Sequence, residues 1–263
     1  MTPSLPEPRP ATEILVRHCH GLKQFQACYE LQRRVWGNSD IDVPVPVFVV
    51  AAETGGQVLG AFLGSDGDVK NLIGFTMAVA GWRNSAPFLH SHMTAVLNEY
   101  RDRGVGRRLK LFQREDALNR GIELVEWTFD PLEVKNAYFN FVRLGAIARR
   151  YLPNCYGITN SPLHGGLPTD RLVAEWYLRS PRALAAMGGA GSCMPGQRLA
   201  DPKTILVPSE LEKMKRDAPA DALQTQARIR GEFQQLFAAG YVATSMQVNA
   251  ECGCYTLERM ETY

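Results

Sequence analysis

The chain has 263 residues, of which 45% are hydrophobic and 21% charged, and this is the composition of an ordinary globular protein. Its length suits one large domain, or one domain of usual size with a smaller companion. The net charge of +2 is too small to favour nucleic acid or an anionic membrane as a partner.

The sequence also lacks the usual marks of an exported or metal-binding protein. No apolar run approaches the roughly 20 residues that cross a bilayer. The Pro-rich residues 1–12 have no signal-peptide pattern and are expected to be a disordered tail. Six scattered cysteines do not form a disulfide framework, and Cys252 and Cys254 have no second pair nearby to complete a metal site. We therefore expect a cytoplasmic protein with no bound metal.

Hydrophobic periodicity predicts an α/β protein with a mixed sheet, in which hairpin strands precede helix crossovers. Strands are expected at residues 13–18, 57–63, 72–82, 90–97, 122–129 and 171–178. Helices are expected at residues 22–36, 106–119 and 130–144, and residues 43–53 fit either a helix or a strand. The last helix has a strong start signal, because Asp130 suits the N-cap, Pro131 the first turn and Glu133 a capping box.

The character of the sequence changes near residue 181. We therefore divide the chain into a domain at 13–181 and a C-terminal α+β segment at 182–263. Residues 183–196 are rich in Ala and Gly and predict a linker. Beyond it, strands are expected at 204–207, 241–248 and 254–259, and a helix at 219–239. We expect this segment to pack on the main sheet or on a second subunit of a homodimer.

The most informative stretch runs from a strand through a short basic loop into a helix. Gly104 and Gly106 open that helix and let backbone amides approach an anion closely. The helix N-terminus adds free N–H groups and the positive end of its dipole. Basic residues surround the glycines, at Arg101, Arg103, Arg107, Arg108 and Lys110. The pattern predicts a pyrophosphate site.

Two other phosphate-binding motifs fit this loop less well. A dinucleotide fingerprint needs a third glycine, but Leu109 stands in its place. A P-loop needs Gly-Lys followed by Ser or Thr, and this is absent. An ordinary loop with a solvated basic face is the structural alternative.

The pattern Arg-x-x-Gly-x-Gly at 101–106, entered from the strand Met-Thr-Ala-Val at 93–96, resembles the acetyl-CoA motif of the GNAT superfamily of N-acetyltransferases. A second family signature, an Asn-led helix that ends in Leu-Gly, is similar to residues 136–146. The resemblance covers residues 13–178 and implies the GNAT fold, extended by the C-terminal segment. It also implies these cofactor-binding residues: Ala95, Val96, Arg101, Arg103, Gly104, Val105, Gly106, Arg107 and Asn136.

The chain is also similar to a bacterial branch of predicted GNAT proteins that carry Trp-Thr-Phe-Asp-Pro-Leu, here residues 127–132. The resemblance implies acetyl-CoA, or another acyl-CoA, as the cofactor and a primary amine as the acceptor, and we expect a small-molecule amine. Transfer would occur by direct attack in a ternary complex. The alternative is a CoA-binding sensor or interaction module on the same scaffold, without turnover.

One usual catalytic group is missing. Many GNAT enzymes protonate the leaving thiolate with a Tyr four residues before the Gly of the second signature. That position is Phe141 here, which favours the non-catalytic alternative. Tyr138 lies about one helical turn away and is a weak substitute, with a packing role as its alternative.

A pair of histidines starts the strand that leads to the loop. His90 and His92 are two residues apart, so on a strand they point to the same face. Their spacing from the Ala-Val and the glycine loop resembles serotonin N-acetyltransferase, and the resemblance implies that they are the catalytic base and relay. An imidazole pKa near ~6.5 suits that role. The alternatives are two structural histidines, or a zinc site completed by His164 or Asp130.

Arginines suggest the chemistry of the acceptor. A carboxylate could be held by Arg149, Arg150, Arg171, Arg228 and Arg230. We therefore expect amino acids to outperform simple amines, with succinyl-CoA as a second donor to test. The alternative is that these arginines are solvated.

Overall fold

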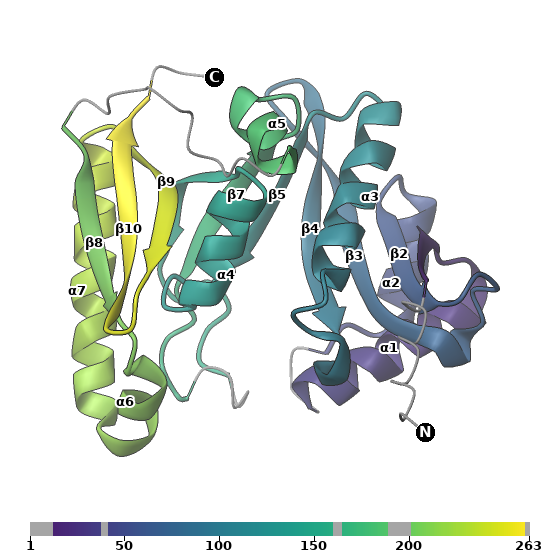
Figure 1. Cartoon of the computed structure of the whole chain (residues 1–263), viewed down its shortest axis with the longest axis horizontal. Coiled ribbons are helices and arrows are strands. Elements are labelled where there is room, and N and C mark those ends of the chain that lie inside the picture. The colour runs from purple at the N-terminus through teal and green to yellow at the C-terminus, as the bar shows by residue number, and fades with distance from the viewer. Residues whose placement is uncertain (1–12, 38–41, 160–164, 189–200, 261–263) are drawn as a thin grey trace, which may run out of the picture.

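The computed structural model describes residues 13–37, 42–159, 165–188 and 201–260 (Figure 1). Over these residues one ten-stranded sheet crosses the molecule in the order β1-β2-β3-β4-β5-β7-β6-β9-β10-β8. Its strands are β1 (Ile14–His18), β2 (Gln57–Leu63), β3 (Leu72–Arg83), β4 (Ala86–Val96), β5 (Leu124–Phe129), β6 (Ile147–Leu152), β7 (Arg171–Tyr177), β8 (Lys203–Pro208), β9 (Tyr241–Val248) and β10 (Cys252–Arg259). Every neighbouring pair is antiparallel except β4 and β5, which are parallel.

The helices are α1 (Gly21–Trp36), α2 (Val45–Glu53), α3 (Val105–Asn119), α4 (Val134–Tyr138), α5 (Pro181–Met187), α6 (Leu211–Asp217) and α7 (Pro219–Ala238). Two short 3₁₀ turns, η1 (Val69–Asn71) and η2 (Asn98–Tyr100), precede β3 and α3. A π-helical segment, η3 (Phe139–Arg143), continues α4. None of the described helices is long and apolar enough to cross a membrane.

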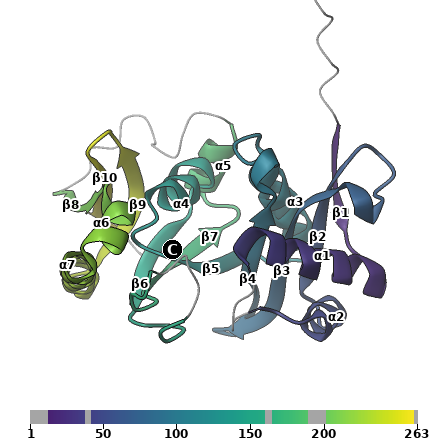
Figure 2. The ribbon, with the colours of Figure 1, turned by 90° about the horizontal axis from the view of Figure 1, so that it is seen from below.

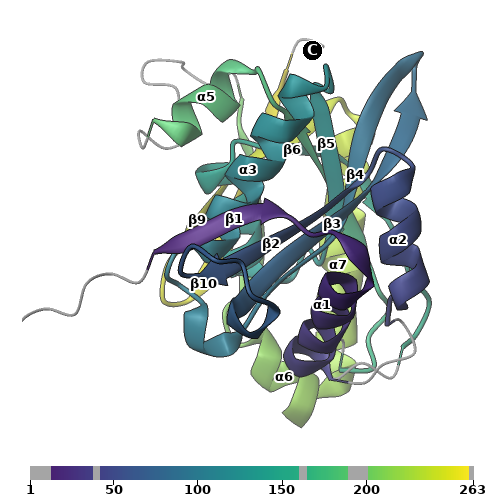
Figure 3. The same cartoon turned by 90° about the vertical axis from the view of Figure 1, so that its right-hand side faces the viewer.

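The first half of the sheet lies between helices on both faces. Figure 3 shows α1 and α2 on one side of β1–β4 and α3 on the other. Helix α1 buries Phe25, Cys28 and Leu31, which recur at helical spacing and form one cluster with α2, β2 and β3. Helix α2 begins at Val45 after the N-cap residue Pro44, and Pro46 lies in its first turn, where a proline suits the helix geometry. This resolves the ambiguity of residues 43–53 in favour of a helix.

The C-terminal segment extends the same sheet (Figure 2). Strand β9 joins the edge of β6 through the pair Ala148 and Ala243, and β10 and β8 follow. Helix α7 buries a stripe that includes Ile229 and Phe233, and the Phe233 ring packs on that of Tyr255 with centroids 5.0 Å apart. The hydrophobic cluster that contains these residues also contains side chains of β5, β7 and α4. Of the two expected arrangements, the segment packs on the main sheet.

The predicted helix start at Asp130 is wrong. The Asp130 carboxylate accepts from the Leu132 backbone N–H at 2.8 Å and closes a turn, while Glu133 N donates to Asp130 O at 3.1 Å. The helix begins only at Val134. An Asp-Pro pair suits both a turn and a helix start, so the sequence at residues 130–133 does not distinguish the two structures.

Two further differences concern elements the sequence pattern missed. Strand β6 was not predicted, and α5 occupies the start of the predicted linker because Ser180 caps it and Pro181 opens it. The short α6 was also missed. The rest of the predicted linker lies outside the described residues.

Candidate functional site

Strands β4 and β5 are joined at one end and separate at the other (Figure 1). Their parallel ladder contains only two pairs, Leu89 with Val125 and His90 with Glu126. Beyond His90, β4 remains paired with β3 as far as Val96, while β5 pairs with β7. The register on β3 skips His92, which is a β-bulge. The split between β4 and β5 therefore opens from His90 toward the end of β4.

A helix N-terminus stands at the open end of this split. Gly104 is the N-cap residue of α3 and has a left-handed backbone (φ 78°), which glycine adopts without strain. It offers no side-chain hydrogen bond to cap the helix. The first backbone N–H groups of a helix have no intrahelical acceptor. A Cβ atom placed on Gly104 or Gly106 would meet nothing within 4 Å, so space lies open beside these amides. The arrangement fits a phosphate group.

The basic side chains around this N-terminus differ in their surroundings. Arg101 and Arg103 are exposed, with Arg101 Nε donating to Val96 O at 3.3 Å and the Arg103 guanidinium 5.6 Å from the centre of the Tyr100 ring. Arg107 instead points to the end of α5, where Nη2 lies 3.3 Å from Met187 O. The expectation of phosphate contact by the Arg107 side chain is therefore not supported, although its backbone N–H belongs to the first turn. The side chain of Val105 is buried and serves packing.

The other predicted cofactor residues lie on β4 and α4. Ala95 and Val96 are on β4, paired with Phe75 and Gly74 of β3. Asn136 is exposed in the first turns of α4.

The two histidines lie at the joined end. The ring centroids of His90 and His92 are 6.2 Å apart, so the predicted proximity is found in spite of the bulge. Desolvation lowers the pKa of both imidazoles, and for His90 the neighbouring His92 lowers it further while Glu126 opposes the shift. Both histidines are therefore held toward the neutral form that can accept a proton.

Buried carboxylates on β5 and β7 bind the arginines near His90. Glu126 accepts from Arg83 and Arg150, and Glu175 lies 3.1 Å from Arg149 Nε. Both carboxylates are under a tenth exposed, whereas the arginines are partly exposed. Strand β6 skips one residue of register at Arg149, which brings two consecutive arginines to these carboxylates.

The arginines of the C-terminal half are also bonded within the protein. Arg230 makes two hydrogen bonds to the fully buried Asp170, at 2.7 and 2.9 Å, and Arg171 donates to Asp170 O. Arg228 pairs with Glu232 at 2.7 Å. The expectation that these arginines wait for an acceptor carboxylate gains no support from this arrangement.

The segment that carries the second signature is irregular. Phe141 is fully buried against Phe129 and Tyr255, and Tyr138 is exposed. Asn140, on the π-helical η3, is 1% exposed and accepts from Trp127 Nε1 at 3.3 Å. Its own Nδ2 is buried and has no hydrogen-bond acceptor among the described residues.

Lys110 is the site residue whose position the sequence pattern did not indicate. It follows Arg107 and Arg108 and seemed part of one basic face, yet it is only 5% exposed. Its Nζ donates to Ser91 Oγ at 2.8 Å and to Gln113 Oε1 at 3.0 Å, and lies 4.1 Å from the centre of the Trp127 ring. Burial lowers the Lys110 pKa to about 7. The run of basic residues does not reveal this, because successive helical positions point in different directions around the helix axis.

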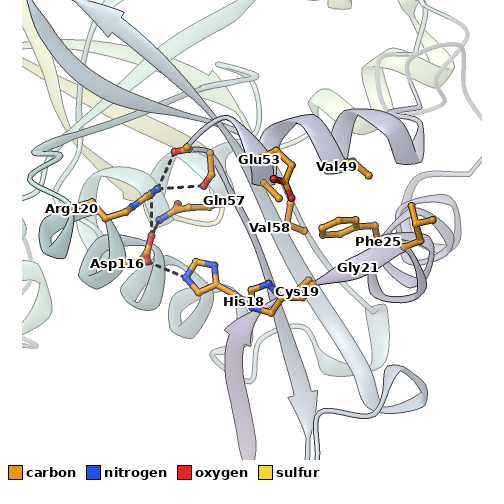
Figure 4. Close-up of a pocket in the computed structure, with 15 residues that line it drawn as sticks. His18, Cys19, Gly21, Phe25, Val49, Glu53, Gln57, Val58, Asp116 and Arg120 are labelled. Atoms are coloured by element: carbon orange, nitrogen blue, oxygen red, sulfur yellow. Dashed lines mark hydrogen bonds and ion pairs between the residues drawn. The ribbon is translucent and has the colours of Figure 1, made fainter.

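A separate surface pocket of about 360 Å³ lies at the end of β1, between α1, α2 and α3 (Figure 4). Its polar groups bind one another, with Asp116 within 3.0 Å of His18 and Arg120 and 2.6 Å from Gln57. In the described part of the chain no group of three or more His, Cys, Asp or Glu side chains could hold a metal ion. His164, a ligand in the zinc alternative, lies outside that part.

Solved structures share this fold. The chain is similar to Arabidopsis thaliana NAA60 in complex with acetyl-CoA, with 15% identity, a TM-score of 0.53, and coverage of 64% of this chain and 100% of that one. The NatC complex bound to Gag peptide and CoA matches with 14% identity and a TM-score of 0.50, covering 63% and 98%. The chain has the GNAT fold. It matches no protein-family model and no curated protein.

Proposed function

We propose that the chain is an acyl-CoA-dependent N-acyltransferase that transfers an acetyl group to a primary amine. One observation carries the proposal. A single split between β4 and β5 has the open N-terminus of α3 at its wide end and His90 beside His92 where the strands join. The proposed anion site and the two proposed bases would thus lie at the two ends of one split.

The residues around the split suit a nucleotide-linked thioester such as acetyl-CoA, which would supply an activated acyl group. The backbone amides from Gly104 to Arg107 would hold the pyrophosphate, and the exposed Arg101 and Arg103 would neutralise further phosphate charge. The main chain of Ala95 and Val96 would line the pantetheine arm. Asn136 would approach from α4.

His90 and His92 would remove the proton from the acceptor ammonium. An imidazole pKa below the ordinary ~6.5 leaves the base unprotonated at neutral pH. The attacking amine would then form the amide bond directly in a ternary complex.

The acceptor is proposed to be the primary amine of a small molecule. Because Arg149, Arg150 and Arg230 are already paired with protein carboxylates, the proposal does not require a carboxylate on the acceptor. Steady-state rates with a free amino acid and its decarboxylated amine, each with acetyl- and succinyl-CoA, separate the two cases. Equal rates for both acceptors would remove the amino-acid preference expected from the sequence.

A CoA-binding module without turnover is the second candidate, and the buried Phe141 in place of a tyrosine favours it. Thiol release from acetyl-CoA with a panel of amines decides between the two, with CoA affinity measured by calorimetry on the same preparation. Amide formation matched by thiol release supports the enzyme. CoA binding without amide formation for any amine supports the module.

A further inference from the structure

Lys110 lies at the point where β4 and β5 part, on the face opposite to His90. The last ladder pair joins His90 to Glu126, and the next residue on each strand, Ser91 and Trp127, faces α3. The Lys110 amine touches both of them, 2.8 Å from the Ser91 hydroxyl and 4.1 Å from the centre of the Trp127 ring. It therefore occupies the inner end of the split.

The burial of the Lys110 ammonium group at the inner end of the split is unusual. The charged form of lysine is costly to bury unless it is paired. Among the described residues no ion pair joins Lys110 to a carboxylate, and its partners are the neutral Ser91, Gln113 and Trp127. A leucine or methionine would fill the same volume without this cost.

A second polar group at the same place is also incompletely bonded. Asn140 reaches the Trp127 indole from η3 through Oδ1, while its buried Nδ2 has no acceptor in the described part of the chain. Buried donors are rarely left unpaired. Lys110 contacts the face of the Trp127 ring and Asn140 contacts its Nε1, so both bring N–H donors to Trp127, where a thioester entering from the α3 N-terminus would end.

We propose that Lys110 is the general acid that protonates the leaving thiolate, in place of the absent tyrosine; this rests on the proposed function. The acceptor nitrogen forms a bond to the acyl carbon, and the carbon–sulfur bond breaks with its electron pair moving to sulfur. Lys110 gives one proton to that sulfur and becomes a neutral amine. His90 and His92 take one proton from the acceptor nitrogen, and exchange with solvent restores both groups.

The surroundings of Lys110 fix the expected pH dependence. Strand β4 presents Ser91, β5 presents Trp127, and η3 presents Asn140, while His90 on the other face of β4 is near enough for the Lys110 charge to lower its pKa. On its own helix Gln113 contacts it, and Asp116 lies beyond, bonded to Gln57, which also bonds Gln113. An acid must be protonated to act, so kcat should fall as pH rises through the Lys110 pKa of about 7.

Two substitutions separate proton transfer from packing and charge. Lys110→Met keeps the volume and removes the proton, whereas Lys110→Arg keeps the cation but cannot release its proton near neutral pH. We expect each to lower kcat for amide formation by roughly 10²-fold, with little change in CoA affinity and without the alkaline fall in rate. Lys23→Met, at an exposed position of α1, should leave all three quantities unchanged. Wild-type kcat in a folded Lys110→Arg protein would overturn the assignment.

A binding measurement tests the same claim without turnover. The thiolate absorbance of bound CoA, followed against pH, gives the pKa of its thiol. Beside the Lys110 ammonium this pKa should lie below the ~8.5 of an ordinary thiol, and it should rise in Lys110→Met. Equal values in the two proteins contradict the role of Lys110 while leaving CoA binding intact. Failure of the wild-type protein to bind CoA at all overturns both this role and the proposed function.

Discussion

The backbone of His90 pairs with that of Glu126, and beyond this pair β4 and β5 are no longer joined. The position has two consequences for the chemistry. It places the imidazoles at the inner end of the split, and it leaves the far end of β4 free to lead into η2 and the N-terminus of α3. The second half of β4 and the segment through η2 thus separate the proposed base from the proposed phosphate site.

Gly106→Val should abolish CoA binding without unfolding the protein. The new side chain would meet no protein atom, since a Cβ there has nothing within 4 Å, but it would fill the space in front of the helix amides. Calorimetry should show an affinity loss of at least about 100-fold, equivalent to about 2.7 kcal/mol. Gly231→Val on α7 is the matched control, because its Cβ also meets open space in a helix far along the chain. Undiminished affinity in Gly106→Val would reject the site.

His90→Gln and His92→Gln should each lower kcat by roughly 10²-fold or less, the usual contribution of a general base. Both pKa values are lowered, so the neutral base persists below the ordinary ~6.5, and the wild-type rate should fall only as pH drops below that value. The acidic limb should move or disappear in the variants, while CoA affinity stays unchanged. His20→Gln, at an exposed position before α1, serves as the control. If both variants keep the wild-type rate and pH profile, the histidines have a structural role and are not the catalytic base and relay.

Arg230→Met should destabilise the fold rather than alter catalysis. Asp170 is fully buried, and the substitution would remove two of its hydrogen bonds, leaving those from Tyr151 and the Asn154 backbone. Removing one partner of a buried ion pair lowers the free energy of unfolding by about 3 kcal/mol. Because the ion pair of Arg228 with Glu232 is exposed, Arg228→Met should change the free energy of unfolding by no more than about 0.5 kcal/mol. Chemical denaturation of the two variants measures the contrast, and a loss of activity without a loss of stability in Arg230→Met would point back to acceptor recognition.

Much of the fold and the cofactor loop could be predicted because their signals are local. The helices that contain Phe25 and Ile229 have apolar residues at helical spacing, and Gly104 and Gly106 mark a loop-to-helix junction by their backbone freedom alone. The His-x-His spacing likewise gives a shared face on a strand, and the bulge at His92 did not separate the rings.

The features that were missed depend on contacts between distant segments. Strand β6 contains Arg149 and Arg150 side by side. They suit a strand only because Glu175 on the neighbouring β7 and Glu126 on β5, one strand further, receive them. Lys110 is buried only because Ser91 and Trp127 meet at the inner end of the split. No sequence window around either site contains its partners.

A crystal structure of the protein with acetyl-CoA tests the central claim most directly. We expect the pyrophosphate on the backbone amides of Gly104–Arg107, and the thioester at the inner end of the split between His90 and Lys110. A cofactor bound elsewhere, or bound with its sulfur remote from both residues, would contradict the proposed function.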